Sequence, residues 1–547
     1  MTIVADKIII SGKVHTMQPG IDERNAITQA IAIKDDKIIA TGSNEDIKLL
    51  ADRSTKVIDA KGNLVLPGLQ DTHIHFQLSS ADLYHSAVLY EAQTLDQALA
   101  IIKDYSEKNP HKKWIRGMGF DAGIFSEQEL TKEALDSVTG SRPALILAND
   151  YHNGWANSKA FELAGVTAGS KEPENGRFAR CEDGNPKGFI FEDAIWHMAK
   201  SAPGYSDDEL LEAMTHYSKE FNKHGITGVL DAMAPRSYLK NYRALNDLGD
   251  LTLRVRCTSK IFAHNPLQPQ LDELISMREE YNDDMVSLHS AKFFLDGVME
   301  NGTANFIDPR SDNGENAELM FTPQQINEYF TAFDKERFQL HVHTIGDGAV
   351  RAALDGIEAA QLTNGKWDSR HQLAHLQVVD PHDIPRFKQL GVLANFQALW
   401  AQPNEENDNL VHGMLGKTRS EWIFPVGEFV AQGATCMLSS DWGVSTFEPF
   451  PIIQSGITRQ TLEANEDSEV NTPQHRIDIQ TAIEGYTINA AHAAWREDVT
   501  GSIEVGKYAD LAIFDQDVFR ISAYNIHKTK ALLTLLGGKE VYRADGF

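Results

Sequence analysis

Two histidines separated by a single residue, His73 and His75, end an apolar segment and are the side chains best suited to chemistry in this chain. In a β-strand, residues two apart point to the same face, so both imidazoles could be directed at one point. Neutral imidazoles are good ligands for divalent transition metals. A pair of this kind on its own is more often bonded to backbone carbonyls, so the interpretation as metal ligands needs further residues.

Four more candidate ligands follow along the chain, each after a short apolar run: Lys292, His343, His375 and Asp441. Imidazoles and carboxylates together form a ligand set that suits Zn²⁺. This order of ligand types is hard to obtain by chance and predicts a metal site. Two other histidines, His341 and His371, lie an even number of residues from a candidate ligand and could face the same way. For both we expect packing or a supporting role.

The elements that must position these residues are short strands alternating with helices, which is typical of a parallel α/β domain. One strand leads from the apolar run 64–68 into His73. Seven more are predicted at 228–230, 253–256, 291–295, 338–342, 372–376, 392–396 and 436–438. Eight strands with intervening helices predict a closed (β/α)8 TIM barrel. The candidate ligands then fall at the carboxyl ends of the strands, where such barrels place their chemistry.

The two ends of the chain have a different character, with short strands and tight turns. A hairpin is predicted over 30–42, and strands over 509–514 and 531–542. We therefore expect 1–63 and 495–547 to form one composite β-sandwich domain, and 64–494 to form the barrel. The connection 86–195, between the first two barrel strands, is too long for a plain loop and predicts an inserted lid subdomain.

Composition excludes some classes of partner. The 547 residues include 51 Lys and Arg against 78 Asp and Glu, a net charge of −27, which repels phosphate backbones and argues against nucleic acid. No apolar stretch approaches the roughly 20 residues of a membrane span, and the first residues do not form a secretion signal. Three cysteines without metal or disulfide spacing suit a reducing cytoplasm. We expect a cytoplasmic protein with a small-molecule substrate, and a homodimer is an open expectation.

Taken together, the motifs resemble the amidohydrolase superfamily along nearly the whole chain. The general signature is Pro67-Gly68 before the Asp71–His75 motif, then His343, His375 and Ser440-Asp441, and finally the tail 501–511. Narrower features resemble the amidohydrolase-3 branch, typified by N-substituted formamide deformylases. They are the segments 114–121, 150–158, 292–304, 343–347 and 440–442.

The resemblance implies how the ligands are shared. His73, His75 and Asp441 would hold one divalent ion and His343 with His375 a second, with zinc the expected metal at one or two ions per chain. A buried ammonium beside cations is costly, whereas the neutral amine of Lys292 can add carbon dioxide. The resemblance implies such a carbamate (N6-carboxylated Lys292) bridging both ions. The alternative is a lysine paired with Asp296 or another acid.

The same resemblance implies a metal-dependent hydrolase that cleaves a C–N bond in an amide, N-acyl or N-formyl group of a small organic molecule. A metal-activated hydroxide would attack, while Asp441 takes the proton from water and passes it to the leaving nitrogen. Hydrolysis of a cyclic amide, lactone or amidine, or deamination, remains open at the same site. Deaminases more often use one metal and no bridging lysine, so Lys292 argues against them. A third alternative is a degenerate, non-catalytic barrel, against which the complete ligand set weighs.

Several side chains are candidates for substrate contact. Asp150, His152 and Trp155 lie in the insertion, where they could touch substrate or simply hold the lid together. Phe294, Gln397, Trp400 and Trp442 lie near strand ends and could line the pocket or belong to the core. Relatives often have Gln-Pro-X-His on the seventh strand, where this chain has Gln397-Ala398-Leu399-Trp400. The missing imidazole leaves the metal ligands intact, but the substrate of these relatives does not transfer to this chain on the resemblance alone.

Overall fold

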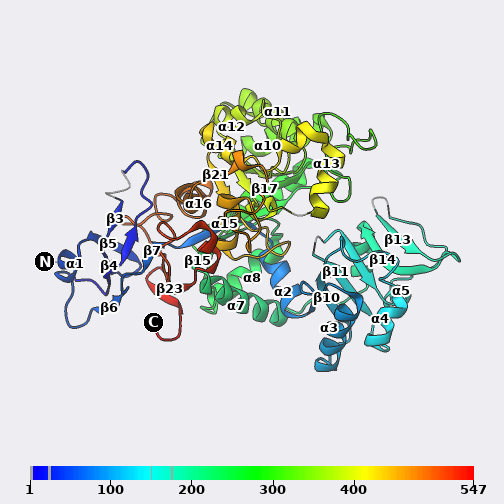
Figure 1. The fold of residues 1–547 in the computed structure, drawn as a ribbon, viewed down its shortest axis with the longest axis horizontal. Helices are drawn as coiled ribbons and strands as arrows, with labels where there is room; N and C mark the ends of the chain where they lie inside the picture. The colour runs from blue at the N-terminus through cyan, green and yellow to red at the C-terminus, as the bar shows by residue number, and fades with distance from the viewer. Residues whose placement is uncertain (1–3, 22–25, 150, 174–175, 404) are drawn as a thin grey trace. The chain divides into compact units, whose positions relative to one another are not determined.

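The computed structural model describes residues 4–21, 26–149, 151–173, 176–403 and 405–547 (Figure 1). The chain divides into two compact units. The first comprises Met1–His75, Ser218–Asp441 and Phe447–Phe547, and the second comprises Phe76–Tyr217 with Trp442–Thr446.

Eight parallel strands form the centre of the first unit. They are β8 (Leu69–Ile74), β15 (Ile226–Asp231), β16 (Arg254–Lys260), β17 (Val286–Phe294), β18 (Gln339–Thr344), β19 (Gln372–His375), β20 (Leu393–Phe396) and β21 (Cys436–Leu438). Neighbouring strands pair in the order β21-β20-β19-β18-β17-β16-β15-β8. The backbone N–H of Asp441, just after β21, donates to the carbonyl of His73 in β8 over 2.8 Å and joins the two ends of the sheet. The predicted (β/α)8 barrel is confirmed, and it is nearly closed.

Contrary to the prediction, the apolar run before His73 does not belong to the first barrel strand. Residues Leu64–Pro67 form a separate strand, β7, which pairs with β2 (Lys13–His15) and β22 (Leu511–Phe514). All four residues of β7 are buried, and buried strands of either sheet read as the same continuous apolar run. The barrel strand begins two residues later, at Leu69.

The ends of the chain form two further sheets. One has the order β5 (Lys37–Gly42), β4 (Ala30–Lys34), β1 (Lys7–Ile10), β6 (Lys56–Asp59). The other has the order β24 (Lys539–Arg543), β23 (Ala531–Leu536), β22, β7, β2, β3 (Ile27–Thr28). Side chains from both sheets, including Ile31, Ile33, Val65, Leu511 and Leu533, share one buried cluster. Strands from the two ends therefore pack as a sandwich.

Helices follow the barrel strands. They are α7 (Asp207–Lys223), α8 (Arg236–Asp247), α9 (Leu267–Glu280), α10 (Pro323–Lys335), α11 (Asp347–Asn364), α12 (Ile384–Leu390), α13 (Glu405–Arg419), α14 (Val426–Ala431), α15 (Pro449–Thr458), α16 (Ile479–Tyr486) and α17 (Ile488–Ala493). Helix α10 begins with a capping box between Thr322 and Gln325, and its first residue is proline. None of the helices in the described ranges is long and apolar enough to cross a membrane.

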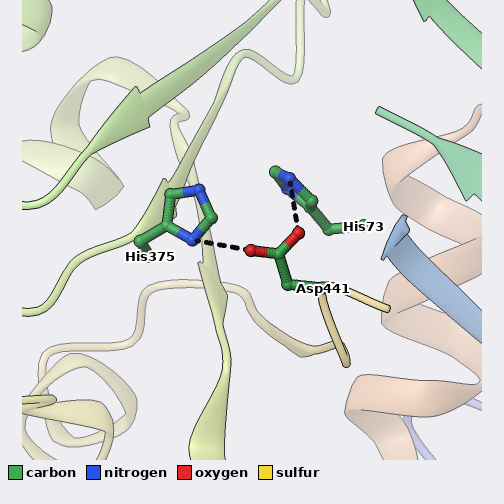
Figure 2. A group of neighbouring side chains, drawn as sticks. All are labelled: His73, His375 and Asp441. Atoms are coloured by element: carbon green, nitrogen blue, oxygen red, sulfur yellow. Dashed lines mark ion pairs between the residues drawn. The ribbon is translucent and has the colours of Figure 1, made fainter. Parts of the chain in front are cut away.

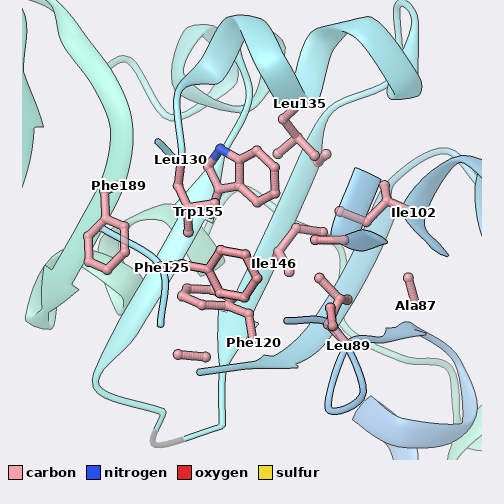
Figure 3. Close-up of a cluster of buried hydrophobic side chains, with 14 of the residues drawn as sticks. Ala87, Leu89, Ile102, Phe120, Phe125, Leu130, Leu135, Ile146, Trp155 and Phe189 are labelled. Carbon is pink, nitrogen blue, oxygen red and sulfur yellow. The ribbon is translucent and has the colours of Figure 1, made fainter. Parts of the chain in front are cut away.

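The second unit has its own six-stranded sheet, β13 (Gly176–Arg180), β14 (Pro186–Glu192), β12 (Asn153–Ala156), β11 (Ala144–Ala148), β10 (Ile115–Phe120), β9 (Ala87–Val88). Its helices are α2 (Phe76–Tyr84), α3 (Leu95–Lys108), α4 (Lys132–Thr139), α5 (Ser158–Leu163) and α6 (Asp193–Ala199). Phe120, Phe125, Ile146 and Trp155 belong to its buried core (Figure 3). This unit extends beyond the expected 86–195 at both ends, because it includes α2, the residues leading into α7 and the first part of α7 as far as Tyr217. Its action as a lid stays a prediction.

Candidate metal centre

The carboxyl ends of the barrel strands carry the six candidate ligands. His73, Lys292 and His343 lie near the carboxyl ends of β8, β17 and β18, and His375 is the final residue of β19. His75 directly follows β8, and Asp441 follows β21 after two intervening residues. The parallel strands thus deliver residues from distant parts of the sequence to one end of the barrel.

Asp441 is the centre of this group. One carboxylate oxygen, Oδ1, lies 3.2 Å from Nε2 of His75 and 3.6 Å from Nε2 of His73. The other, Oδ2, lies 3.8 Å from Nδ1 of His375. Figure 2 shows the carboxylate between the imidazoles of His73 and His375, and one ligand atom from each of these three buried residues lies within 4.8 Å of the others.

The chemistry of this donor set fits a divalent ion. Oδ1 of Asp441 is buried and makes no hydrogen bond with any described residue, which is costly for a carboxylate oxygen unless something else binds it. Burial, followed by the charge of Lys292, holds the pKa of His73 well below its usual range, and burial also lowers that of His375. Both imidazoles are therefore neutral, the form that coordinates a metal.

Backbone strain marks two of the same residues. His375 and Asp441 have φ values of +80° and +53°, in the left-handed region that residues with a Cβ rarely adopt. Such a conformation costs about 1–3 kcal/mol and persists where the surroundings enforce it, often at functional sites. The surroundings therefore hold both residues in a costly conformation at the carboxyl end of the barrel.

Lys292 is fully buried in the middle of this group. Its Nζ lies 3.2 Å from Nε2 of His73 and 4.9 Å from the centre of the Phe294 ring. Burial lowers the pKa of Lys292 to about 7. No carboxylate forms an ion pair with it within the described part of the chain. The lysine is thus held close to a candidate ligand without a fixed acid partner.

Asp296, the alternative partner of Lys292, is engaged elsewhere. Its carboxylate accepts the backbone N–H groups of Asn305, Ile345 and Gly346 at 2.9–3.0 Å. These bonds tie the segment after β17 to the segment that follows His343. The structure therefore gives Asp296 a role in positioning the loops.

His343 lies beside His375, with 4.4 Å between their ring centres. Its Nε2–H donates to the carbonyl of Gly297 over 3.0 Å, and Phe294 lies against its ring at 5.0 Å. The imidazole is thus next to the cluster, although it is not one of the three residues whose ligand atoms converge.

The two neighbouring histidines occupy supporting positions. Nε2 of His341 lies 2.9 Å from Nδ1 of His73, on the side of that ring away from Asp441. A hydrogen bond there fixes which nitrogen of His73 presents its lone pair. His371 accepts the backbone N–H of Leu340 through Nδ1, and its Nε2 contacts Asp334 at 3.0 Å. His371 is a packing residue.

A network of buried amides and hydroxyls supports His375, and the sequence offered no motif for most of it. Nδ1–H of His375 donates to Oε1 of Gln397 over 2.8 Å, and Nε2 of Gln397 donates to Ser439 over 2.7 Å. Ser439 donates to Asn395, which in turn donates to the carbonyl of Thr72 in β8. This chain of bonds fixes the orientation of the His375 ring.

We expect Gln397→Leu to weaken metal binding about 10- to 100-fold, because the bond that orients the His375 ring is lost. Metal affinity measured with a competing chelator checks this. The matched control is Gln361→Leu, since Gln361 is also a buried glutamine but donates to the carbonyl of Leu390 in a helix of the barrel wall. Equal metal affinity of the Gln397 variant and wild type would show that the bond does not position His375.

The candidate substrate contacts are scattered. Phe294 lies against Lys292 and His343, and Trp400, in the short helix Ala398–Ala401, stacks on His375 with 5.7 Å between ring centres. Gln397 is fully buried and serves His375.

The remaining candidates belong to the second unit. Trp155 is fully buried in its core and donates to the carbonyl of Thr131, so its surroundings favour a structural role. His152 pairs with Glu192 at 2.7 Å, and Trp442 packs against Phe76 and Tyr217. Asp150 lies outside the described residues.

Comparison with known proteins places this site in a family. The model of the Amidohydrolase family, Amidohydro_3, matches residues 56–542. The chain belongs to the amidohydrolase family. It is accordingly a metal-dependent hydrolase that acts on carbon–nitrogen bonds of small molecules.

Individual relatives span the full length. The N-substituted formamide deformylase of Arthrobacter pascens is 26% identical over 578 residues, covering 100% of both chains. Protein LONG AFTER FAR-RED 3 of Arabidopsis thaliana is 26% identical over 99% of this chain and 92% of its own. Among solved structures, an uncharacterized metal-dependent hydrolase from Pyrococcus horikoshii has a TM-score of 0.76 at 20% identity, covering 94% of this chain and 99% of its own. The last similarity concerns the fold.

Proposed function

We propose that this enzyme hydrolyses the amide bond of an N-acyl or N-formyl derivative of a small organic amine, at a centre of two metal ions bridged by carboxylated Lys292. The observation that carries this proposal is the buried Nζ of Lys292, 3.2 Å from Nε2 of His73. Deaminases more often work without such a lysine. The full-length similarity to an N-substituted formamide deformylase supports the choice of substrate class.

In the proposed centre, His73, His75 and Asp441 would hold one ion and His343 with His375 would hold the other, with zinc the expected metal. When bound, divalent ions supply Lewis acidity, which lowers the pKa of water and polarises a carbonyl. Lys292 reaches its bridging form when the neutral amine adds carbon dioxide and loses one proton, giving a carbamate with two oxygens. The low pKa of Lys292 makes the neutral amine accessible near pH 7.

Asp441 moves the proton. Its Oδ1 accepts a proton from the attacking water as the new carbon–oxygen bond forms. The same carboxyl then gives that proton to the amide nitrogen as the carbon–nitrogen bond breaks, which releases a free amine and a carboxylic acid. The neutral imidazoles of His73 and His375, at 3.6 and 3.8 Å, neither compete for this proton nor neutralise the carboxylate.

Trp400 and Phe294 flank this centre and form the proposed substrate wall. Trp400 takes the place where relatives often have histidine, so an aromatic ring lies parallel to His375, with 5° between the ring planes. A flat apolar surface favours an apolar or aromatic substituent on the amine. The free thiols Cys181, Cys257 and Cys436 support a reducing compartment, and we propose the cytoplasm.

A substrate screen tests the proposal. Zinc-loaded enzyme is offered N-formyl and N-acyl amines, cyclic amides, lactones and amino-heterocycles, and the release of amine, acid and ammonia is measured. We expect amine release from the open-chain amides, with N-benzyl-type formamides above N-methyl ones. Ammonia from amino-heterocycles without amine from any amide would favour a deaminase, and ring opening alone would favour a cyclic substrate.

A further inference from the structure

Lys260 is a cation at the carboxyl end of the barrel that the proposed mechanism does not use. It is the last residue of β16 and pairs in register with Lys292 on β17. Just beyond this pair, the backbone N–H of Ile261 donates to the carbonyl of Lys292 over 2.8 Å. Directly paired residues of neighbouring strands point to the same face of a sheet. The side chain of Lys260 therefore faces the interior of the barrel, as that of Lys292 does.

Two phenylalanine rings lie around the ammonium group of Lys260. Its Nζ is 4.6 Å from the centre of the Phe294 ring and 5.1 Å from that of the Phe262 ring. An ammonium within about 6 Å of a ring centre is attracted by the ring face. Gln270 fixes the backbone of Phe262, since it accepts the N–H at 2.8 Å and donates to the carbonyl at 3.1 Å. The ammonium of Lys260 thus has a defined place.

This place is partly open to solvent. Phe262 is 39% exposed, and Lys260 and Phe294 are both half-buried. A small molecule can therefore reach the ammonium and the Phe294 ring, which is not true of the fully buried Lys292.

Phe294 connects the ammonium of Lys260 to the candidate metal centre. The same ring lies 4.9 Å from Nζ of Lys292 and 5.0 Å from the ring of His343. Phe294 is also one side of the proposed substrate wall. A substrate that packs on this ring has its neighbouring groups close to Nζ of Lys260.

An ammonium in this position suits a negatively charged group. It has three N–H donors, and contact with ring faces stabilises its charge without pairing those donors with oxygen. A hydrogen bond between an ammonium and a carboxylate is stronger than one between neutral groups. The net charge of the chain is −27, so its surface as a whole does not attract anions. Attraction of an anionic substrate therefore requires a local cation.

We propose that Lys260 binds a carboxylate that the substrate carries on its amine half, beyond the amide that is cleaved. This inference rests on the proposed function and narrows its substrate class to N-acyl or N-formyl amines with a carboxylate. The carboxylate lies against Nζ of Lys260 while an apolar substituent packs on Phe294. Lys260 thus determines specificity and takes no part in the proton transfers of Asp441.

Two substrates that differ in one charge test this. Racemic N-formylphenylalanine and its carboxamide have almost the same shape, but only the first carries a carboxylate. Formate release by zinc-loaded enzyme is measured for both, and the readout is the ratio of their kcat/KM values. We expect a ratio of at least about 10 in favour of the carboxylate, because only that substrate forms the charge-assisted bond.

Substitutions of Lys260 should change this ratio. Lys260→Met should bring it to about 1, and Lys260→Glu should invert it, because like charges repel. A loss of metal affects both substrates alike and leaves the ratio unchanged, so the ratio separates a role in specificity from a structural one. Lys37→Met is the matched control, since Lys37 also lies on an aromatic ring, 3.1 Å from the centre of Tyr508, but belongs to the sandwich. It should keep the wild-type ratio.

A soaking experiment needs no variant. Crystals of the zinc-loaded enzyme soaked in phenylalanine, the amine product, should show its carboxylate within hydrogen-bond distance of Nζ of Lys260. If the Lys260 variants do not fold, this measurement and the wild-type ratio decide. A carboxylate bound away from Lys260 would contradict the inference.

The outcomes also separate this inference from the proposed function. Formate release from both compounds with a wild-type ratio near 1, or with the same ratio in Lys260→Met, would overturn the inference and leave the proposed function standing. No release from these compounds or from any other open-chain amide would overturn both.

Discussion

Asp441→Asn should lower kcat at least about 1000-fold, since an amide neither accepts the proton of the attacking water nor returns one to the leaving nitrogen. Asparagine keeps the size and one oxygen of the side chain. The loss should therefore appear in kcat more than in KM, with part of the metal retained. Steady-state kinetics on an N-formyl amine and metal analysis of the same preparation measure both effects.

Asp334→Asn is the matched control for this variant. Asp334 is also a fully buried aspartate of the barrel unit, and it contacts His371 and accepts from Trp367 and Asn364. Its replacement should reduce stability and leave kcat of the folded enzyme close to that of wild type. If Asp441→Asn kept more than a tenth of wild-type kcat with full metal content, another group would have to move the proton.

Lys292→Ala should lose at least about 100-fold in activity and roughly half of the bound metal, because the bridge between two ions is removed. Short carboxylic acids such as acetate or propionate should partly restore both, since their two oxygens can fill the bridging position. Metal content and turnover are measured with and without the added acid.

Lys507→Ala is the corresponding control, because Lys507 is a second largely buried lysine, bonded to Ser502 and Glu504 in the sandwich. It should keep activity and metal and show no response to acetate. Normal metal content and near-normal turnover of Lys292→Ala would make the lysine structural and reduce the centre to a single ion.

The barrel was predictable because most of its strands contain a short apolar run that is followed by a polar residue. The runs at 372–376 and 436–438 gave β19 and β21 nearly residue for residue. The run at 64–68 was misleading for the same reason, since β7 is as buried in the sandwich as a barrel strand would be. Burial alone does not tell which sheet a strand joins.

The candidate ligands were predictable from their type and order, whereas the groups that orient them were not. Gln397 stood out only as part of a motif, and Asn395 and Ser439 carry no signature of chemistry. Their roles depend on side chains from different strands meeting inside the barrel, which no local pattern reveals. Trp155 illustrates the converse, because an aromatic residue in a suggestive motif lies in the core of the second unit.

Metal content is the measurement that tests the central claim most directly. The protein is expressed with supplemented zinc, purified without chelator and analysed for metals by mass spectrometry. A centre built on His73, His75, His343, His375, Asp441 and carboxylated Lys292 predicts close to two ions per chain, with activity lost on chelation and restored by zinc. Less than about one ion per chain, with turnover that survives chelation, would contradict a metal-dependent hydrolase.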